Sequence, residues 1–293
     1  MNRLTMQGSS REVRMVAMTF HEIEREAWSK RAADYDSLFA AVAEQAIGPV
    51  LDSVEPLQGK RHLDVASGTG HLVAAASRRG ADSIGVDFAG AMVAMALKSH
   101  PHERYRVADA QDLPFDDEAF DAVTCAFGFS HMQEPQAAVT EAFRVLKPGG
   151  RLAFTLWFGG ENGNEMELIM QEALAAHASA DRSLPREWTC MRLADPAACG
   201  AITALAGFAA PVFRRLPITW RTASTQSVVD IVGRLSIRTR MVIDGQPPEA
   251  RQRIYGQIHR EAEARRSNGI ISLAWPALLT VVQKPVRQQG GLS

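Results

Sequence analysis

The stretch HLDVASGTGHL, residues 62–72, constrains the fold of this chain more than any other segment. An apolar run with β character, His62 to Ala66, meets glycines at positions 68 and 70, and a helical pattern follows through about Arg79. Glycine lets the backbone come close to a ligand, and the free N–H groups of the next helix point toward it. The stretch therefore predicts a ligand-binding loop between a strand and a helix. Because a lone Gly-x-Gly is weak evidence, an ordinary strand-to-helix turn is the alternative.

The following segments repeat the alternation of strand and helix. Residues 83–97 predict a short strand ending in Asp87 and then a helix. Further strands are expected within 105–115, ending in Asp109, within 120–132, and within 148–157 after a Pro-Gly-Gly turn. Such alternation predicts an α/β fold with a parallel sheet covered by helices on both faces, in which ligands bind at the carboxyl ends of the strands.

The residues around this loop narrow the choice of ligand. A dinucleotide fingerprint needs a third glycine at position 73, where this chain has Val73, and the Gly-Lys-Ser/Thr of a phosphate-binding loop is absent. Two carboxylates, Asp64 and Asp87, flank the loop, and Asp109 follows on the next strand. This set suits a cationic ligand without phosphates, such as S-adenosyl-L-methionine.

Four motifs then occur in order between Trp28 and Trp157: LDVASGTG, VDFAGAMVAMA, VADAQDLPFDDEAFDAV and EAFRVLKPGGRLAFTLW. Together they resemble the class I S-adenosylmethionine-dependent methyltransferases, in particular the small-molecule branch that includes ubiquinone/menaquinone-biosynthesis and natural-product methyltransferases. The resemblance implies a Rossmann-like, seven-stranded, mostly parallel sheet with an antiparallel last strand and a helical lid. One departure is the pair Ala66 and Ser67, where that family usually has Gly-Cys, which should leave the loop slightly less backbone freedom.

The same resemblance implies which residues bind the cofactor. The Asp64–Gly70 loop would hold the methionine part, Asp87 the ribose hydroxyls, and Phe127 and Gly128 the methionine amino group through their backbone. Phe88 and Met92 would pack on the adenine, and Asp109 and Ala110 would read its edge. The full set is Tyr35, Asp64, Ala66, Ser67, Gly68, Gly70, Asp87, Phe88, Met92, Asp109, Ala110, Gln111, Phe127 and Gly128.

Methyl transfer to oxygen, nitrogen or an acidic carbon also needs a base, because the acceptor loses a proton. His131 follows the fourth strand in AFGFSHM, and an ordinary histidine titrates near neutrality, so it is the main catalytic candidate. A histidine bonded to backbone at a helix start is the alternative. Tyr35, in an A-x-Y-D motif that the resemblance places near the transferred methyl, is the second candidate. Tyr35 and Trp28 could equally be core aromatic residues.

The rest of the chain predicts one methyltransferase domain over 20–293 after a disordered extension at 1–19. Residues 20–58 predict two helices with a break at Gly48-Pro49, residues 59–158 the cofactor-binding core, and 159–192 with 224–268 a lid. Single strands are expected at 210–221 and 271–285. Asp195-Pro196 predicts a helix start, with the aspartate as N-cap.

The lid predicts an apolar acceptor pocket. Its candidate wall residues are Met166, Met170, Trp188, Met191 and Trp220. Such a pocket suits a hydrophobic aromatic, quinone-like or polyketide-like acceptor, methylated on carbon or oxygen. Ala126 to Phe129 lack the Asn/Asp-Pro-Pro-aromatic turn of adenine-N6 methyltransferases. A non-methylating cyclase of the same fold stays open, and a nicotinamide-dependent oxidoreductase is disfavoured by Val73.

Composition bounds the partners. The net charge of −1 and pI of about 6.7 give no electrostatic reason to expect nucleic acid. Three cysteines without metal-ligand spacing predict a reducing, cytoplasmic location and no metal site. No apolar run reaches the ~18 residues of a membrane span. A homodimer is compatible with the sequence.

Overall fold

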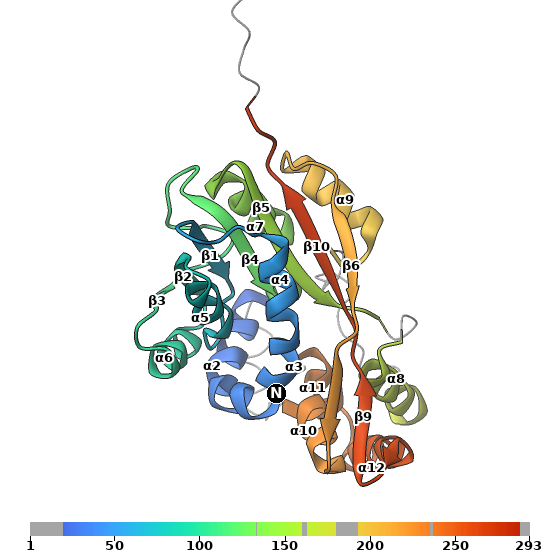
Figure 1. Ribbon diagram of the computed structural model, residues 1–293. Helices are drawn as coiled ribbons and strands as arrows, with labels where there is room; N and C mark the ends of the chain where they lie inside the picture. The colour runs from blue at the N-terminus through green and yellow to red at the C-terminus, as the bar shows by residue number, and fades with distance from the viewer. Residues whose placement is uncertain (1–19, 133, 160–162, 180–192, 235–236, 288–293) are drawn as a thin grey trace, which may run out of the picture.

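A seven-stranded sheet forms the centre of the structure, a computed structural model that describes residues 20–132, 134–159, 163–179, 193–234 and 237–287 (Figure 1). The strand order is β3-β2-β1-β4-β5-β10-β6. The strands are β1 (Arg61–Val65), β2 (Asp82–Asp87), β3 (Arg104–Val107), β4 (Phe120–Ala126), β5 (Leu146–Trp157), β6 (Val212–Leu216) and β10 (Ala277–Gln283). The predicted extension at 1–19 lies outside the described residues.

The strand directions confirm the predicted α/β class. The pairs β1–β2, β1–β4, β2–β3 and β4–β5 are parallel, whereas β10 runs antiparallel to both β5 and β6. The strand expected to end at Asp109 is shorter than predicted: β3 ends at Val107, and Asp109 instead forms an isolated bridge with Asp112. The aspartate therefore lies in a turn just beyond the sheet.

Helices cover both faces of the sheet, as the near-continuous apolar strands require. On one face, α4 (Ile47–Ser53) and α5 (His71–Arg78) share a buried cluster with inward-facing residues of β4 and β5. On the other face, α7 (Pro135–Val145) and α9 (Pro196–Leu205) share a second cluster with the alternate residues of the same strands. Helix α6 (Gly90–Ser99) packs against β2 and β3.

The N-terminal helices differ from the prediction. The chain forms α2 (Phe20–Leu38), α3 (Ala40–Ala43), a 3₁₀ turn η1 (Glu44–Ala46) and then α4. The predicted break at Gly48-Pro49 is wrong, because both residues lie in the first turn of α4. Proline is tolerated there, since the first-turn N–H groups have no partner within the helix.

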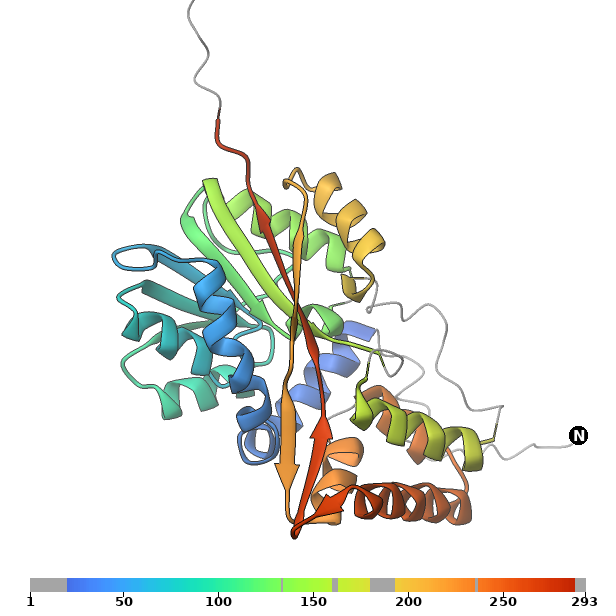
Figure 2. The same ribbon diagram turned by 45° about the vertical axis from the view of Figure 1, so that its right-hand side comes forward.

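A second layer of structure, here called the cap, stands beyond the carboxyl ends of the parallel strands (Figure 2). It contains four helices and a three-stranded sheet of order β7-β9-β8. Its elements are α8 (Glu165–His177), α10 (Thr225–Arg234), α11 (Ile237–Asp244), α12 (Pro248–Ala264), β7 (Thr219–Thr222), β8 (Arg266–Ser267) and β9 (Ile270–Ala274). It contains α8 from the predicted lid segment 159–192, and α10, α11 and α12 from the segment 224–268.

Two prolines divide strands that the sequence analysis predicted as continuous. Residues 210–221 form β6 and β7 on either side of Pro217, and residues 271–285 form β9 and β10 on either side of Pro276. Proline has no N–H for the ladder, so a central strand stops there. The two breaks lie together, because Trp275 N–H donates to the Ile218 carbonyl (2.9 Å). Two adjacent antiparallel segments thus pass from the main sheet into the cap.

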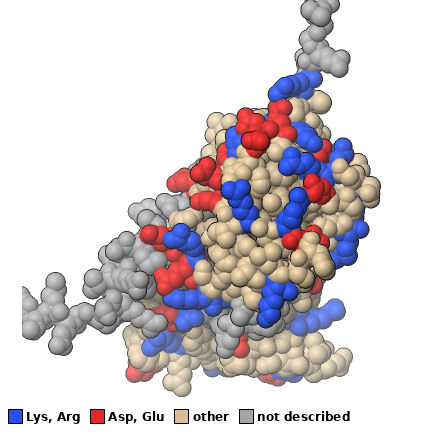
Figure 3. All heavy atoms as spheres, turned by 90° about the vertical axis from the view of Figure 1, so that its left-hand side faces the viewer, with Lys and Arg blue, Asp and Glu red and all other residues tan. Residues whose placement is uncertain are grey.

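Charged side chains are mixed in sign on the face shown in Figure 3, where lysine and arginine alternate with aspartate and glutamate. This pattern agrees with the net charge of −1. That face therefore offers no broad region of positive charge for a polyanion.

Candidate functional site

The loop between β1 and α5, residues 66–70, is held in a conformation that depends on glycine. Gly68 and Gly70 have φ of 53° and 90°, values that L-residues with side chains rarely adopt. A Cβ on Gly70 would lie 2.3 Å from the Tyr105 hydroxyl oxygen, so the position has no space for one. The predicted strand–loop–helix unit is therefore present and fixes where α5 starts.

Ala66 occupies a left-handed conformation without being glycine, with φ of 54°. Its methyl group also faces Gly128, the first residue of the 3₁₀ turn η2 (Gly128–His131), where an added Cβ would lie 2.4 Å away. Ala66, where the resembling family usually has glycine, is therefore locally strained. A left-handed conformation costs an L-residue about 1–2 kcal/mol.

Asp87, at the end of β2, is buried beside this loop. Its Oδ2 accepts from Gly68 N–H (3.0 Å) and its Oδ1 accepts from Ala89 N–H (2.9 Å). Burial raises the pKa of Asp87 to about 6, although both N–H groups and the nearby His131 favour the ionised form. The carboxylate therefore fixes the loop and presents negative charge at the end of the strand.

Asp64, on β1, lies in a separate buried chain of hydrogen bonds beneath the loop. The Thr124 hydroxyl donates to Asp64 Oδ1 (2.7 Å), and that same hydroxyl oxygen lies 2.9 Å from His62 Nε2. Because the threonine proton is used, His62 Nε2–H must donate to it, and Nδ1 accepts from the Ser83 hydroxyl (3.2 Å). Burial lowers the pKa of His62 to about 3, so its ring is neutral at physiological pH.

The pKa of Asp64 is raised to about 7, mainly by burial and further by the charge of Asp87, while the Thr124 hydrogen bond opposes the rise. Two neighbouring carboxyl groups with raised pKa values form a site where a cation would be stabilised by charge.

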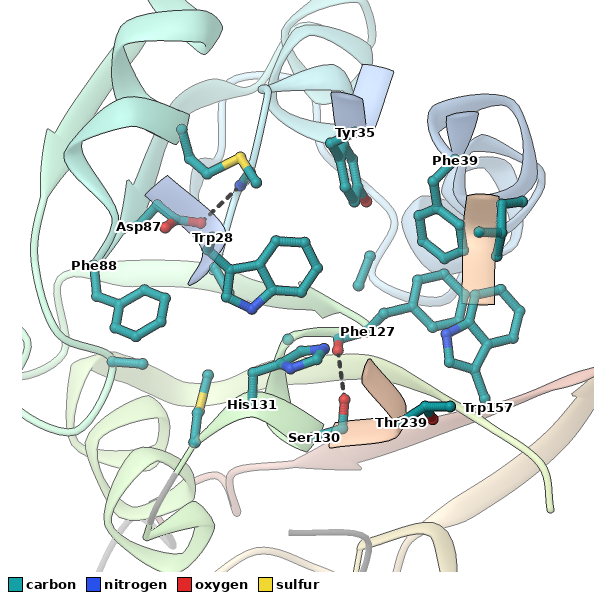
Figure 4. Close-up of a pocket in the computed structure, with 18 of the residues that line it drawn as sticks. Trp28, Tyr35, Phe39, Asp87, Phe88, Phe127, Ser130, His131, Trp157 and Thr239 are labelled. Atoms are coloured by element: carbon teal, nitrogen blue, oxygen red, sulfur yellow. Dashed lines mark hydrogen bonds between the residues drawn. The ribbon is translucent and has the colours of Figure 1, made fainter. Parts of the chain in front are cut away.

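A cavity of about 500 Å³ opens at the carboxyl ends of β1, β2, β4 and β5 and extends under the cap (Figure 4). One end is lined by Asp87, Phe88 and Met92, and the other by Met166, Met170 and aromatic rings. At the aromatic end Phe127 stacks on Trp157, with ring centroids 3.9 Å apart and planes 8° apart. The rings of Phe39 and Trp275 contact Trp157 from the side. The Asp87 carboxyl group thus lies at one end and the cluster of aromatic rings at the other, where Asn164, Glu167 and Thr239 also line the cavity.

The structure brings most predicted site residues to this cavity. Those that line it are Tyr35, Ala66, Gly68, Asp87, Phe88, Met92, Asp109, Ala110, Gln111, Phe127, Gly128 and His131. Asp64, Ser67 and Gly70 are not among the lining residues: Ser67 and Gly70 belong to the loop itself, and Asp64 is buried on β1. Of the predicted acceptor wall, Met166 and Met170 line the cavity, Trp220 is buried without lining it, and Trp188 and Met191 lie outside the described residues.

Trp157 and Trp275 also line the cavity and were not predicted as site residues. Trp275 follows β9, and Trp157 ends β5, so both reach the cavity from strands that the sequence showed only as apolar runs. His21 and Trp28 come from α2, and His21 Nε2 lies 3.7 Å from Asp109 Oδ2. Only the fold shows that α2 lies along the cavity. The spacing of Glu24 and Trp28, four positions apart, did indicate that the two residues share one face of a helix.

His131, the predicted base, lies at the middle of the cavity on η2 (Figure 4). Its Nδ1 lies 3.0 Å from Glu24 Oε2, and Trp28 packs edge-on against its ring. Among the described residues, the hydrogen-bond partner given for the His131 ring is the Glu24 side chain.

Two searches of the described residues bear on other kinds of site. The described part of the chain holds no group of three or more His, Cys, Asp or Glu side chains placed for a metal ion. Within the same residues, no helix has both the length and the apolar character that crossing a membrane requires.

The fold and the loop define a Rossmann-like domain of the class I methyltransferase type. Comparison with known proteins agrees: residues 63–154 match the family model described as a methyltransferase domain. Residues 63–154 thus carry a methyltransferase domain, and this family implies S-adenosyl-L-methionine as the methyl donor.

The matched relatives are similar over part of their length. The demethylmenaquinone methyltransferase of Clavibacter sepedonicus is 44% identical over 103 residues, covering 34% of this chain and 42% of that protein. That of Renibacterium salmoninarum is 41% identical over 140 residues, covering 46% and 59%. The chain thus spans about half the length of these relatives.

Solved structures share the fold at low identity. The YcgJ protein of Bacillus subtilis has a TM-score of 0.53 at 22% identity, covering 83% of this chain and 99% of that one. Phosphoethanolamine N-methyltransferase 2 of Haemonchus contortus has a TM-score of 0.55 at 17% identity, covering 92% of this chain and 60% of that one.

Replacing Ala66 by glycine should relieve the strain at this position. We expect Ala66→Gly to raise the free energy of unfolding by about 0.5–1 kcal/mol, because glycine adopts φ of 54° without a Cβ penalty but gains freedom in the unfolded chain. Urea unfolding of both proteins measures this. Ala74→Gly, in the regular helix α5, is the control and should lower stability. Destabilisation by Ala66→Gly would contradict the strain.

The raised pKa of Asp64 predicts a pH dependence of stability. A carboxyl whose pKa is higher in the folded state contributes stability below its unfolded pKa near 4 and loses it as pH rises through about 7. Asp64→Asn keeps an acceptor for Thr124 without a charge. Its free energy of unfolding should exceed that of the parent by roughly 1–3 kcal/mol at pH 8, with little difference at pH 4. If the free energies of unfolding of the variant and the parent differed by the same amount at pH 4 and pH 8, the pKa of Asp64 would not be raised by folding. Asp82→Asn, exposed at the start of β2, is the control.

Proposed function

We propose that this protein transfers the methyl group of S-adenosyl-L-methionine to carbon or oxygen of a small, hydrophobic aromatic, quinone-like or polyketide-like acceptor. The observation that carries the proposal is the single cavity that joins the Asp87 end to the aromatic end, with His131 between them. Relatives named demethylmenaquinone methyltransferases support a quinone-like acceptor.

In this proposal the cofactor occupies the polar end. The Asp87 carboxylate accepts from the ribose hydroxyls, and the adenine lies against Phe88 and Met92, with Asp109 and Ala110 at its edge. The methionine part follows the loop at Gly68 toward Gly128. Buried carboxyl groups at this end offset the positive charges of the cofactor.

The acceptor occupies the aromatic end, under the cap. Trp157, Trp275 and Phe39 supply flat apolar surface, and Met170 supplies an adaptable wall. The cap excludes water and holds the acceptor atom about 3–3.5 Å from the methyl carbon, in line with the bond to sulfur. Since the sulfonium carries its own leaving group, positioning does most of the catalysis.

Proton removal is the remaining step. His131 takes the proton of the acceptor as the methyl group moves from sulfur to the acceptor, leaving S-adenosylhomocysteine. Incubating the protein with methyl-labelled cofactor and a panel of quinols, phenols and polyketides tests the function. A product heavier by one CH₂ group supports it, whereas a product of unchanged mass indicates a cyclase, and no product from any acceptor class contradicts the proposal.

Removing the Asp87 carboxylate should weaken cofactor binding. We expect Asp87→Ala to lose about 1.5–3 kcal/mol of affinity for S-adenosylmethionine, the scale of hydrogen bonds to a charged group. Titration calorimetry on the folded variant measures this. Asp82→Ala, at the exposed opposite end of the same strand, is the matched control and should bind normally. Unchanged affinity in Asp87→Ala would remove the ribose assignment.

Removing the His131 ring should slow turnover more than it weakens binding. We expect His131→Ala to lower kcat by ~10²–10⁴-fold, the range of general-base catalysis, with cofactor affinity changed little because the ring faces the acceptor. Single-turnover kinetics with labelled cofactor separates the two quantities. A decrease in kcat of less than threefold would mean that His131 has a structural role, and Tyr35 would then be the candidate base.

A further inference from the structure

Glu24, on α2, is a buried carboxyl group with an unusual set of contacts. Its side chain is 0% exposed, and its Oε2 lies 3.0 Å from Trp28 Nε1 and 3.0 Å from His131 Nδ1. Glu24 and His131 are 107 positions apart in the chain. Glu24 does not itself line the cavity, whereas Trp28 and His131 do.

The contacts at Oε2 indicate where the protons lie. The Trp28 indole N–H can only donate, so Oε2 accepts from it. When Glu24 is ionised, Oε2 has a second lone pair that accepts from His131 Nδ1–H, and the neutral ring is then the Nδ1–H tautomer. Among the described residues no donor reaches Glu24 Oε1, so the two N–H groups are the partners that offset its burial.

The ring of His131 is then oriented for use. Trp28 packs against it edge-on, with centroids 4.9 Å apart and planes at 85°. The ring is 27% exposed and lines the cavity, and its recorded hydrogen bond uses Nδ1. Nε2, with its lone pair, is therefore the nitrogen available to an acceptor.

We propose that Glu24 is the positioning residue for the base: it fixes His131 as the Nδ1–H tautomer and stabilises the imidazolium that forms during transfer. This inference rests on the proposed function. Nε2 takes the proton of an acceptor X–H, the electron pair of X forms the bond to the methyl carbon, and the carbon–sulfur pair returns to S-adenosylhomocysteine. The imidazolium, held by the Glu24 carboxylate, later releases its proton to water.

The same contact makes the base depend on α2. That helix packs on α6 through Ala32, Ala89 and Met92, and Met92 also lines the polar end of the cavity. The helix thus contributes to both ends of the reaction: it covers the cofactor end through this apolar contact and completes the base through Glu24.

A double-mutant cycle tests the proposal. Glu24→Gln keeps the shape and can keep an oxygen toward Trp28, but it removes the charge. We expect kcat to fall by about 10–10²-fold with KM for the cofactor within about threefold, and no further fall when Glu24→Gln is added to His131→Gln. Glu26→Gln, an exposed position of the same helix, is the matched control and should not change kcat. An equal fall in both backgrounds would mean that Glu24 only supports the helix, and no fall would also overturn the role.

A second measurement does not depend on activity or on any Glu24 variant. ¹⁵N NMR of the wild-type histidine rings distinguishes the tautomers, with His131→Gln to assign the signal. A neutral ring protonated on Nδ1 is expected, and a ring protonated on Nε2 alone would overturn the proposal. If the tautomer is as expected but no acceptor is methylated, the proposed function fails while the Glu24–His131 arrangement stands.

Discussion

The hydrogen bond from Gly68 N–H to the Asp87 carboxylate is the contact on which the site depends. It connects the loop after β1 to the end of the neighbouring strand β2. The position of the loop is therefore fixed relative to the Asp87 carboxylate. The loop can reach it only because Gly68 and Gly70 adopt positive φ. The direction of α5 and the polar end of the cavity follow from this one local geometry.

The cap depends on a different constraint, the loss of a backbone donor at Pro217 and Pro276. Pro217 follows β6 of the main sheet and precedes β7 of the cap, whereas Pro276 follows β9 of the cap and precedes β10 of the main sheet. The breaks at Pro217 and Pro276 lie next to each other. The main sheet and the cap sheet are therefore connected by two neighbouring chain segments, β6 to β7 and β9 to β10. Trp275, next to Pro276, contacts Phe39 and Trp157 at the cavity. The acceptor end of the cavity is thus built where two sheets meet.

Carboxyl groups surround the centre of the site from three directions. Asp64 and Asp87 come from neighbouring strands and carry raised pKa values because they are buried, while Glu24 arrives on α2. Burial of such groups is unfavourable unless hydrogen bonds or a positive charge offset it. The observed N–H donors supply part of that stabilisation, and under the proposed function the sulfonium and ammonium groups of the cofactor supply the rest.

Local sequence determined the parts of the protein in which neighbouring residues set the geometry. The glycines of the loop, Asp87 at the end of its strand and Asp195 as an N-cap could be predicted, since each acts through its own backbone or the next few residues. The parallel sheet followed from the alternation of apolar strands and helices. The tertiary structure decided what lies opposite each of these elements. That Glu24 contacts His131, that Trp275 lines the cavity, and that Asp64 accepts from Thr124 without lining the cavity depend on packing between segments far apart in the chain. Periodicity records which face of a helix or strand is apolar, but it does not record which partner covers that face.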